Sequence, residues 1–270
     1  MLPGPDLVIA CPFCKFLIRR TTLRSGNTFG AVFWSDGKIK APMLPQYSQI
    51  IKCIGCKNFY WINDAKVKGE YNSVEHHRRI LKKLGIPDET KETKQKTKEL
   101  IVTWRRIKKK IPMRVLSRWE KAPRIDIEAL TLEEYIEAVK KGVADTVERE
   151  IYLRKNLWWV INNKVRWELF YKDLNPQLLE YMDFEEIENN SKLSPEDEMI
   201  LKKDNLEKLQ KLLGDSPDEK IMKAEINRQL GNFEKALELL TDVPEKHLWI
   251  AEQIKEAARN KITTLLKLKT

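Results

Sequence analysis

A chain of 270 residues with 42% hydrophobic residues can bury a sizeable core, and its length predicts one or two domains. No stretch approaches the roughly 18 apolar residues of a membrane-spanning helix, and the first residues lack the features of a signal peptide, so we expect a cytoplasmic protein. The net charge of +10 is uneven: residues 1–125 contain 27 Lys and Arg against 10 Asp and Glu, whereas residues 126–270 contain 23 against 30.

Two CxxC pairs near the N-terminus predict a metal site. Cys11 and Cys14 form the first pair, and Cys53 and Cys56 form the second, with 38 residues between the pairs. Two residues between cysteines let one tight turn direct both sulfurs at one ion, and two such turns complete a tetrahedron. Because four thiolates leave no position for water or substrate, we expect one structural Zn²⁺. A redox pair and an iron–sulfur cluster are the alternatives.

Strand-like segments next to each pair predict a small β zinc ribbon over residues 1–70. The segment KFLIRRTTL follows the first pair, and KNFYWI begins within one residue of the second. Between the pairs, residues 28–34 and 38–43 flank Ser35, Asp36 and Gly37, and an Asp-Gly step is a strong hairpin signal. A domain this small is near the size limit for folding unaided, so metal binding should supply much of its stability.

The stretch from Ser25 to Pro45 has three interpretations: a hairpin scaffold, a loop that contacts a partner, or a catalytic site. It contains no His, Cys, Glu or Tyr, and Asp36 is its single acid. We therefore favour the scaffold, with Asp36 and Gly37 forming the turn. Since Asn tolerates the same turn, the change Asp36→Asn is expected to be nearly silent.

Residues 71–125 form a predicted basic helical connector. His76 and His77 lie on its first helix, and we interpret them as ordinary histidines because four cysteines already complete a metal shell. Further on, cations alternate with Trp104 and Trp119, a composition suited to phosphates and stacked bases. A second interpretation is that Trp104 belongs to a buried stripe with Ile101, Ile107 and Ile111 and the cations form the solvated face. We expect Trp104 to be core and the cations to be exposed, with their use by a polyanion left open. The candidate nucleic-acid-binding residues are Arg105, Arg106, Lys108, Lys109, Lys110, Arg114 and Arg118.

Residues 126–270 form a predicted helical domain with repeat-like hairpins at its end. Thr131 to Glu134 reads as a capping box, and one long helix is expected over about 145–173. Ser194 and Ser216 each precede a proline and an acidic turn, which is typical of a helix start. The last helix is expected over about 245–268.

The segment AEINRQLGNFEKALELL, from Ala224 to Leu240, resembles a tetratricopeptide repeat. Ala224 and Ala236 match the family's small-residue positions, and Gly231 and Phe233 match its turn between helices. The early aromatic residue of the family is replaced by Lys220. The match covers about one repeat. The complete pattern, a CPxC…CxxC ribbon joined to such helices, resembles uncharacterised bacterial proteins, and this implies a fold and a surface for another protein.

Together these features predict an α+β protein, predominantly α, with a zinc ribbon (1–70), a connector (71–125) and a helical domain (126–270). We interpret it as a non-catalytic adaptor that binds a protein partner through its helical half and nucleic acid, DNA or RNA, through its basic half. The alternative is a pure protein–protein module whose basic surface docks an acidic partner. A metalloenzyme is disfavoured because HExxH, P-loop and GxSxG motifs are absent, and we expect neither a membrane nor a small-molecule substrate.

Overall fold

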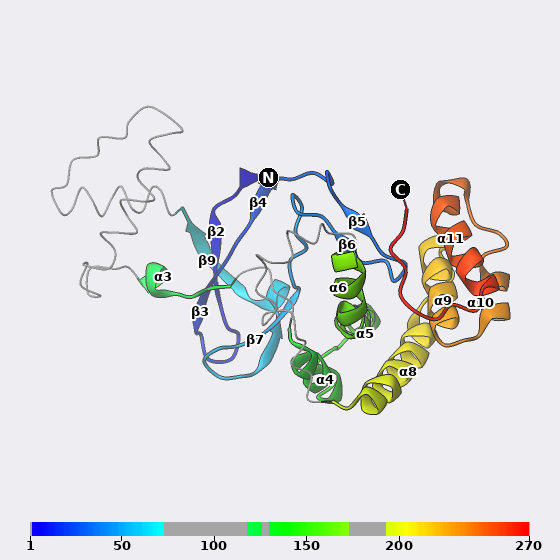
Figure 1. Ribbon diagram of the computed structural model, residues 1–270. Coiled ribbons are helices and arrows are strands. Elements are labelled where there is room, and N and C mark those ends of the chain that lie inside the picture. Colours follow the sequence, from blue (N-terminus) through cyan, green and yellow to red (C-terminus); the bar gives the residue numbers. More distant parts are fainter. Residues whose placement is uncertain (1, 73–117, 126–129, 173–192, 270) are drawn as a thin grey trace. The chain divides into compact units, whose positions relative to one another are not determined.

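The computed structural model describes residues 2–72, 118–125, 130–172 and 193–269. It confirms an α+β fold with a predominance of helix (Figure 1). The chain divides into two compact units: residues 1–27 and 43–129 form unit 1, and residues 28–42 and 130–270 form unit 2. The domain boundaries that the sequence predicts near residues 70 and 125 remain predictions. The sequence did not predict that residues 28–42, which lie between the two CxxC pairs, belong to the helical unit.

Unit 1 is built on a four-stranded sheet. In sheet order its strands are β10 (Arg124–Ile125), β3 (Leu17–Arg20), β2 (Asp6–Ala10) and β9 (Lys66–Tyr71). Strand β2 pairs antiparallel with β3 and β9, whereas β10 pairs parallel with β3. Two short antiparallel pairs accompany the sheet: β1 (Leu2–Pro3) with β4 (Leu23–Ser25), and β7 (Ile50–Lys52) with β8 (Phe59–Trp61). A short 3₁₀ helix, Ile62–Asp64, follows β8.

Helix α3 (Arg118–Lys121) packs against this sheet through Trp119. A Cβ atom on Gly69 of β9 would lie 2.6 Å from Cη2 of Trp119, so the indole occupies the space that a larger residue would fill. Trp119 is therefore a packing residue of unit 1. In the same sheet, the buried carboxylate of Asp6 on β2 lies 3.2 Å from Arg124 and 3.9 Å from Arg19.

Unit 2 contains helices and one β-hairpin. Its helices are α4 (Leu132–Lys140), α5 (Val147–Ile161), α6 (Asn163–Lys172), α8 (Pro195–Leu212), α9 (Pro217–Gln229), α10 (Phe233–Leu239), the 3₁₀ helix η3 (Glu245–His247) and α11 (Leu248–Arg259). Helix α5 packs on α4 and α8, and α9 packs on α10 and α11. Within the described residues, no helix is both long and apolar enough to cross a bilayer.

The predicted helix starts are confirmed by their capping hydrogen bonds. Thr131 begins α4 with a capping box to Glu134, and Ser216 begins α9 with one to Glu219. Ser194 accepts a hydrogen bond from the backbone of Asp197 at the start of α8. These caps satisfy backbone N–H groups that have no partner within the first helical turn. A short local sequence is therefore enough to predict where a helix begins.

Two expected helix lengths were wrong. The helix expected over 145–173 is divided at Asn162, whose buried side chain bonds outside the helix. The last helix ends at Arg259 and not near residue 268. Lys261 has a φ of 54°, and the N–H groups of Ile262 and Lys261 bond back to the carbonyls of Ala257 and Ala258. These bonds form a Schellman motif, which ends the helix. The left-handed position of the motif is occupied by Lys261 and not by the usual glycine, so the sequence did not indicate it.

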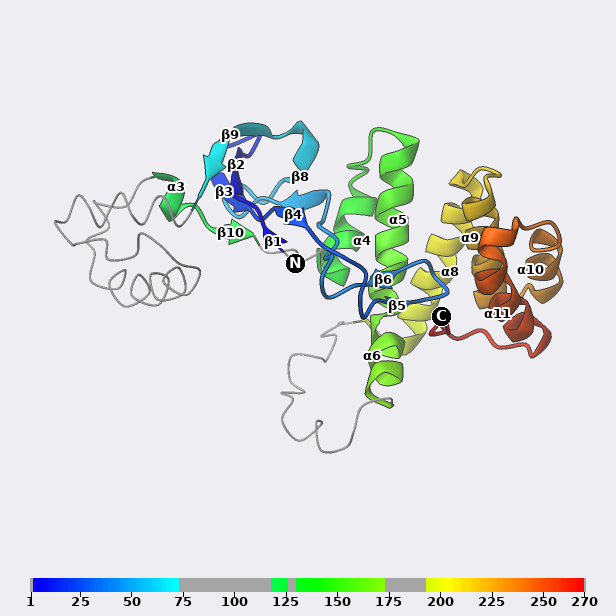
Figure 2. The ribbon, with the colours of Figure 1, turned by 90° about the horizontal axis from the view of Figure 1, so that it is seen from above.

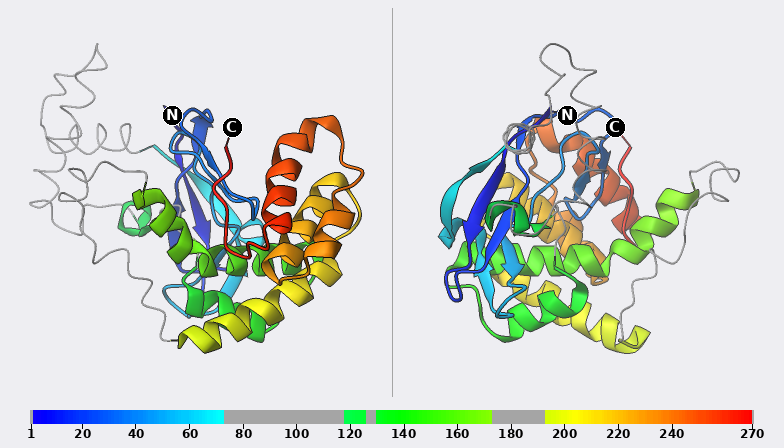
Figure 3. Two further views of the ribbon diagram at one scale, coloured as in Figure 1. Left: turned by 45° about the vertical axis from the view of Figure 1, so that its right-hand side comes forward. Right: turned by 90° about the vertical axis from the view of Figure 1, so that its left-hand side faces the viewer.

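The hairpin of unit 2 comes from the N-terminal part of the sequence. Strands β5 (Val32–Phe33) and β6 (Ile39–Lys40) pair antiparallel, and Gly37 in their turn has a φ of 77°. On its other side, β5 bonds to the C-terminal segment: Leu268 donates to Phe33, Ser35 donates to Leu266, and Trp34 bridges Lys267. Figures 2 and 3 show the blue hairpin and the red C-terminal segment side by side.

Candidate metal centre and buried polar network

The two CxxC pairs form turns of the same construction in unit 1. The first lies between β2 and β3, and the second lies between β7 and β8. The N–H of Cys11 donates to the carbonyl of Phe16 (2.9 Å), and the N–H of Lys15 donates to the carbonyl of Cys11 (3.0 Å). The second turn has the two equivalent hydrogen bonds. The N–H of Cys53 donates to the carbonyl of Asn58, and the N–H of Lys57 donates to the carbonyl of Cys53, each at 2.9 Å.

A lysine in the left-handed region closes each turn. Lys15 has a φ of 62° and Lys57 a φ of 61°. This region costs a non-glycine residue on the order of 1 kcal/mol, and both turns adopt it at the equivalent position. The ammonium of Lys15 also donates to the carbonyl of Pro12 at 2.6 Å.

The four sulfurs, which we call the cysteine cluster, lie within 4.8 Å of one another. Sγ of Cys11 is 3.8 Å from Sγ of Cys56, and Sγ of Cys14 is 3.6 Å from Sγ of Cys53. Four sulfurs at about 2.3 Å from a tetrahedral ion are separated by about 3.8 Å, whereas a disulfide would bring two sulfurs to about 2.05 Å. The cysteine cluster could therefore hold one metal ion, and all four predicted ligands are brought together.

The thiols of the cysteine cluster differ in burial and in pKa. Cys11 and Cys53 are buried, Cys56 is half-buried and Cys14 is exposed. Burial raises the pKa of the Cys11 thiol, and it raises the pKa of Cys53 to about 12. The backbone N–H of Asn58 instead lowers the pKa of Cys56 to about 7. Four thiolates at this spacing repel one another, so a bound cation would stabilise them and binding would release protons.

The predicted nucleic-acid residues lie almost entirely outside the described residues. Arg118 is described: it begins α3 and is exposed. The histidines His76 and His77 and the tryptophan Trp104 also lie outside the described residues. The remaining six predicted nucleic-acid-binding residues also lie outside the described residues: Arg105, Arg106, Lys108, Lys109, Lys110 and Arg114.

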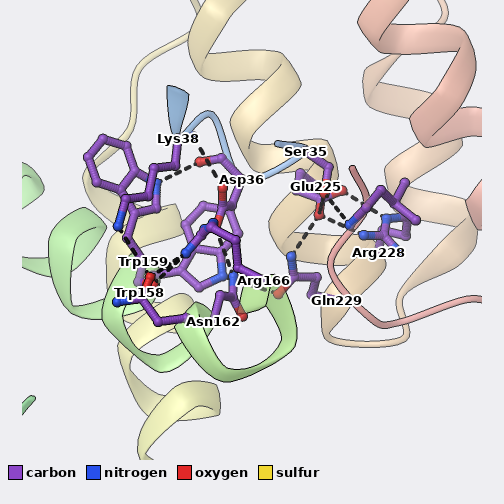
Figure 4. A network of polar contacts seen from close by, with 12 residues as sticks. Ser35, Asp36, Lys38, Trp158, Trp159, Asn162, Arg166, Glu225, Arg228 and Gln229 are labelled. Carbon is purple, nitrogen blue, oxygen red and sulfur yellow. Dashed lines mark hydrogen bonds and ion pairs between the residues drawn. The ribbon is translucent and has the colours of Figure 1, made fainter. Parts of the chain in front are cut away.

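A second polar centre, which the sequence did not predict, holds the hairpin in unit 2. Figure 4 shows Asp36 pointing toward Arg166 and Asn162, and Ser35 pointing toward Glu225 and Arg228. The Asp36 carboxylate is fully buried, and its Oδ2 accepts from Arg166 Nη2 at 2.5 Å and from Asn162 Nδ2 at 2.9 Å. Its Oδ1 accepts from the N–H of Lys38 at 3.1 Å, and its backbone carbonyl accepts from Trp159 Nε1 at 2.9 Å.

The other half of this hairpin network surrounds Glu225, which is also fully buried. Oε1 of Glu225 accepts from Ser35 Oγ at 2.7 Å, from Gln229 Nε2 at 2.7 Å and from Arg228 Nη2 at 2.6 Å. Arg228 also donates to the carbonyls of Ile262 and Thr264, which fixes the chain beyond α11. Each buried acid is thus matched by one buried arginine.

These contacts correct the sequence-based account of Asp36. The turn geometry is as expected, but Asn in place of Asp36 would leave the Arg166 guanidinium buried without a counter-charge, so a silent substitution does not fit the structure. One signal was available in the sequence: Glu225 and Arg228 stand three residues apart within a mostly buried helix face that includes Ile221, Ala224 and Ile226. The network uses its polar atoms to fasten the hairpin, and this favours the scaffold interpretation.

Comparison of the chain with protein-family models, with curated proteins and with solved structures gave no match in any of the three.

Proposed function

We propose that this protein is a non-catalytic adaptor whose unit 1 folds around one structural Zn²⁺. The observation that carries the proposal is the cysteine cluster, whose sulfur spacing fits a tetrahedral ion and whose four ligands would complete its shell. A closed shell of this kind supplies folding free energy and offers no position to a substrate. Free thiolates of this kind persist in a reducing compartment such as the cytoplasm.

A protein partner is proposed for unit 2, on a groove that crosses three of its helices. The groove has a volume of about 580 Å³ and is open to a segment of another chain. Its lining carries both signs of charge, which suits a peptide of mixed charge better than an apolar helix. The lining residues are Glu207, Gln210 and Lys211 of α8, Asp215, Lys223 of α9, and Lys235 and Leu239 of α10.

Nucleic acid is the proposed ligand of the basic half. The excess of 27 cations over 10 acids before residue 126 favours a polyanion, and phosphate contacts give affinity without sequence preference. In the alternative, the same charge docks an acidic protein. Binding to labelled oligonucleotides as salt is varied separates the two, because each phosphate contact contributes about −0.7 to −0.9 to the log–log slope.

The test changes Lys108, Lys109 and Lys110 together to Gln. If these lysines contact phosphates, the slope becomes shallower by roughly two to three units while base preference is unchanged. A protein that binds neither single- nor double-stranded DNA or RNA at about 50 mM salt would contradict the nucleic-acid proposal. Metal analysis of the purified protein tests the zinc proposal separately: one Zn²⁺ per chain supports it, whereas iron or no metal in folded protein refutes it.

A further inference from the structure

Each of the two CxxC turns exposes one large apolar side chain directly beside a cysteine in the sequence. Phe13 immediately precedes Cys14, and Ile54 immediately follows Cys53, and the sulfurs of these two cysteines are 3.6 Å apart. Phe13 is 59% exposed and Ile54 is 49% exposed. Each CxxC turn therefore exposes one large apolar side chain next to a ligand of the cysteine cluster, an aromatic one in the first turn and an aliphatic one in the second. We call these two residues the knuckle tip.

The metal site does not account for this exposure. A CxxC turn needs backbone geometry at its two intervening positions, and Gly55 of the second turn shows that a residue without a side chain is accepted there. Phe16, just after the first turn, packs against that glycine, since a Cβ on Gly55 would lie 3.1 Å from the Phe16 ring. Phe59, Tyr60 and Trp61 of β8 are buried. Phe13 is thus an exception among the aromatic residues near the cluster.

Positive charge surrounds the knuckle tip. Lys15 and Lys57 follow the two turns directly, and both are exposed. The sequences CPFCKF and CIGCKN contain no acid, and the described residues of unit 1 carry eleven Lys and Arg against four Asp and Glu. Four thiolates with one Zn²⁺ would add a formal charge of −2, which these two lysines offset. The resulting surface combines an aromatic face with ammonium groups and a wider positive field.

We propose that the knuckle tip is a stacking platform for an unpaired base of single-stranded nucleic acid, with Lys15 and Lys57 on the flanking phosphates. The inference rests on the proposed nucleic-acid function and gives it a location and a substrate class. An aromatic ring stacks on any base, so the contact tolerates every sequence. Bases within a duplex are already stacked, and a short turn carries no helix to enter the major groove. Single strands are therefore the form that this surface fits.

The test measures the affinity of the full-length protein for labelled oligo-dT and oligo-U of about 16 nucleotides and for a duplex of the same length. Phe13→Ala should weaken binding to the single strands by about 5- to 150-fold, the equivalent of losing one stacked base at ~1–3 kcal/mol. Its salt slope and its affinity for the duplex should be unchanged. Phe13→Trp should keep the affinity. Equal loss on dT and U indicates stacking alone, and a larger loss on one of them identifies the preferred strand.

Three comparisons make the outcome decisive. Val67→Ala removes a side chain that is 53% exposed on β9 of the same unit, and it should have no effect. Metal content and cysteine reactivity equal to wild type show that Phe13→Ala keeps its fold. If wild type binds single strands and Phe13→Ala binds equally well, the inference is wrong while the proposed function stands. If Phe13→Leu keeps full affinity for the single strands, the contact does not need an aromatic ring, and the inference of a stacked base is also wrong. If wild type binds no nucleic acid, both proposals fail.

Discussion

The cysteine cluster of unit 1 and the hairpin network of unit 2 both bury ionisable groups, but they compensate for that burial in opposite ways. The cluster places four thiols within 4.8 Å of one another, where a cation from solution could bind. The hairpin network supplies its own counter-charges, since Asp36 meets Arg166 and Glu225 meets Arg228. We therefore expect unit 1 to respond to metal removal and to acid, whereas unit 2 should respond chiefly to substitution or titration of its own charged members.

The largest expected effect is on the metal-dependent unit. Cys53→Ser removes a buried ligand and should abolish metal binding, whose free energy in small zinc domains is on the order of 10 kcal/mol. Unit 1 should then unfold while the helical circular dichroism of unit 2 is retained. Asn58→Ser, an exposed change in the same turn, should leave both the metal content and the spectrum as in wild type. Loss of the helical signal together with the metal would show that the two centres are not independent.

Asp36→Asn should destabilise unit 2 by about 3–5 kcal/mol, because it leaves the Arg166 charge buried and unpaired. Chemical unfolding followed by helical signal measures the change. Asp242→Asn removes an exposed carboxylate of the same unit and should alter stability by less than about 0.5 kcal/mol. Metal content should be normal in both variants. Additive effects of Asp36→Asn and Arg166→Met in the double variant would contradict a coupled ion pair.

Gly37→Val should cost unit 2 about 1–2 kcal/mol. The φ of 77° at Gly37 lies in the left-handed region, which a β-branched residue resists. A Cβ atom there would meet no other atom within 4 Å, so the cost comes from the backbone alone. Gly37→Asn should cost less, since Asn enters this region more readily. Thermal unfolding of the two variants compares them directly, and equal midpoints would argue against backbone strain as the cause.

The smallest expected effect depends on pH. Burial, with a contribution from Arg166, lowers the pKa of Lys38 from its usual 10.5 to about 8, and Asp36 opposes the shift. Between pH values of about 8 and 10.5, Lys38 keeps its proton in the unfolded chain but has released it in the folded protein. The free energy of unfolding therefore rises with pH in this window. Wild type should therefore gain stability relative to Lys38→Gln as the pH is raised through this window. Urea unfolding at several pH values gives the difference, and a constant difference would refute the effect.

The two centres also differ in how far the sequence could predict them. The metal ligands are of one residue type at fixed short spacing, so CxxC identified all four. The helix starts at Thr131, Ser194 and Ser216 were legible for the same reason, because a cap is a local interaction. The sequence did not predict the left-handed conformation of Lys15, Lys57 and Lys261, because none of these positions has the glycine that usually indicates it.

The hairpin network was beyond local prediction because its partners are distant in the sequence. Asp36 bonds to Arg166 across 130 positions, and Ser35 bonds to Glu225 across 190. A charged residue taken alone reads as a surface residue, and it becomes part of a core only when its partner is known. The hairpin turn could therefore be predicted from Asp36 and Gly37, but its attachment to the helices could not.

The pairing of β5 with the C-terminal segment has a consequence for the order in which the chain can fold. Ser35 and Leu266 are 231 positions apart, so the residues between them must be synthesised before this edge of the hairpin acquires its partner. The turn bearing Asp36 is made early and stays hydrated in the nascent chain until α5, α6 and α9 exist. Contacts of such long range close large loops and form slowly. Completion of unit 2 must therefore wait until residues 266–268 have been synthesised and can pair with β5.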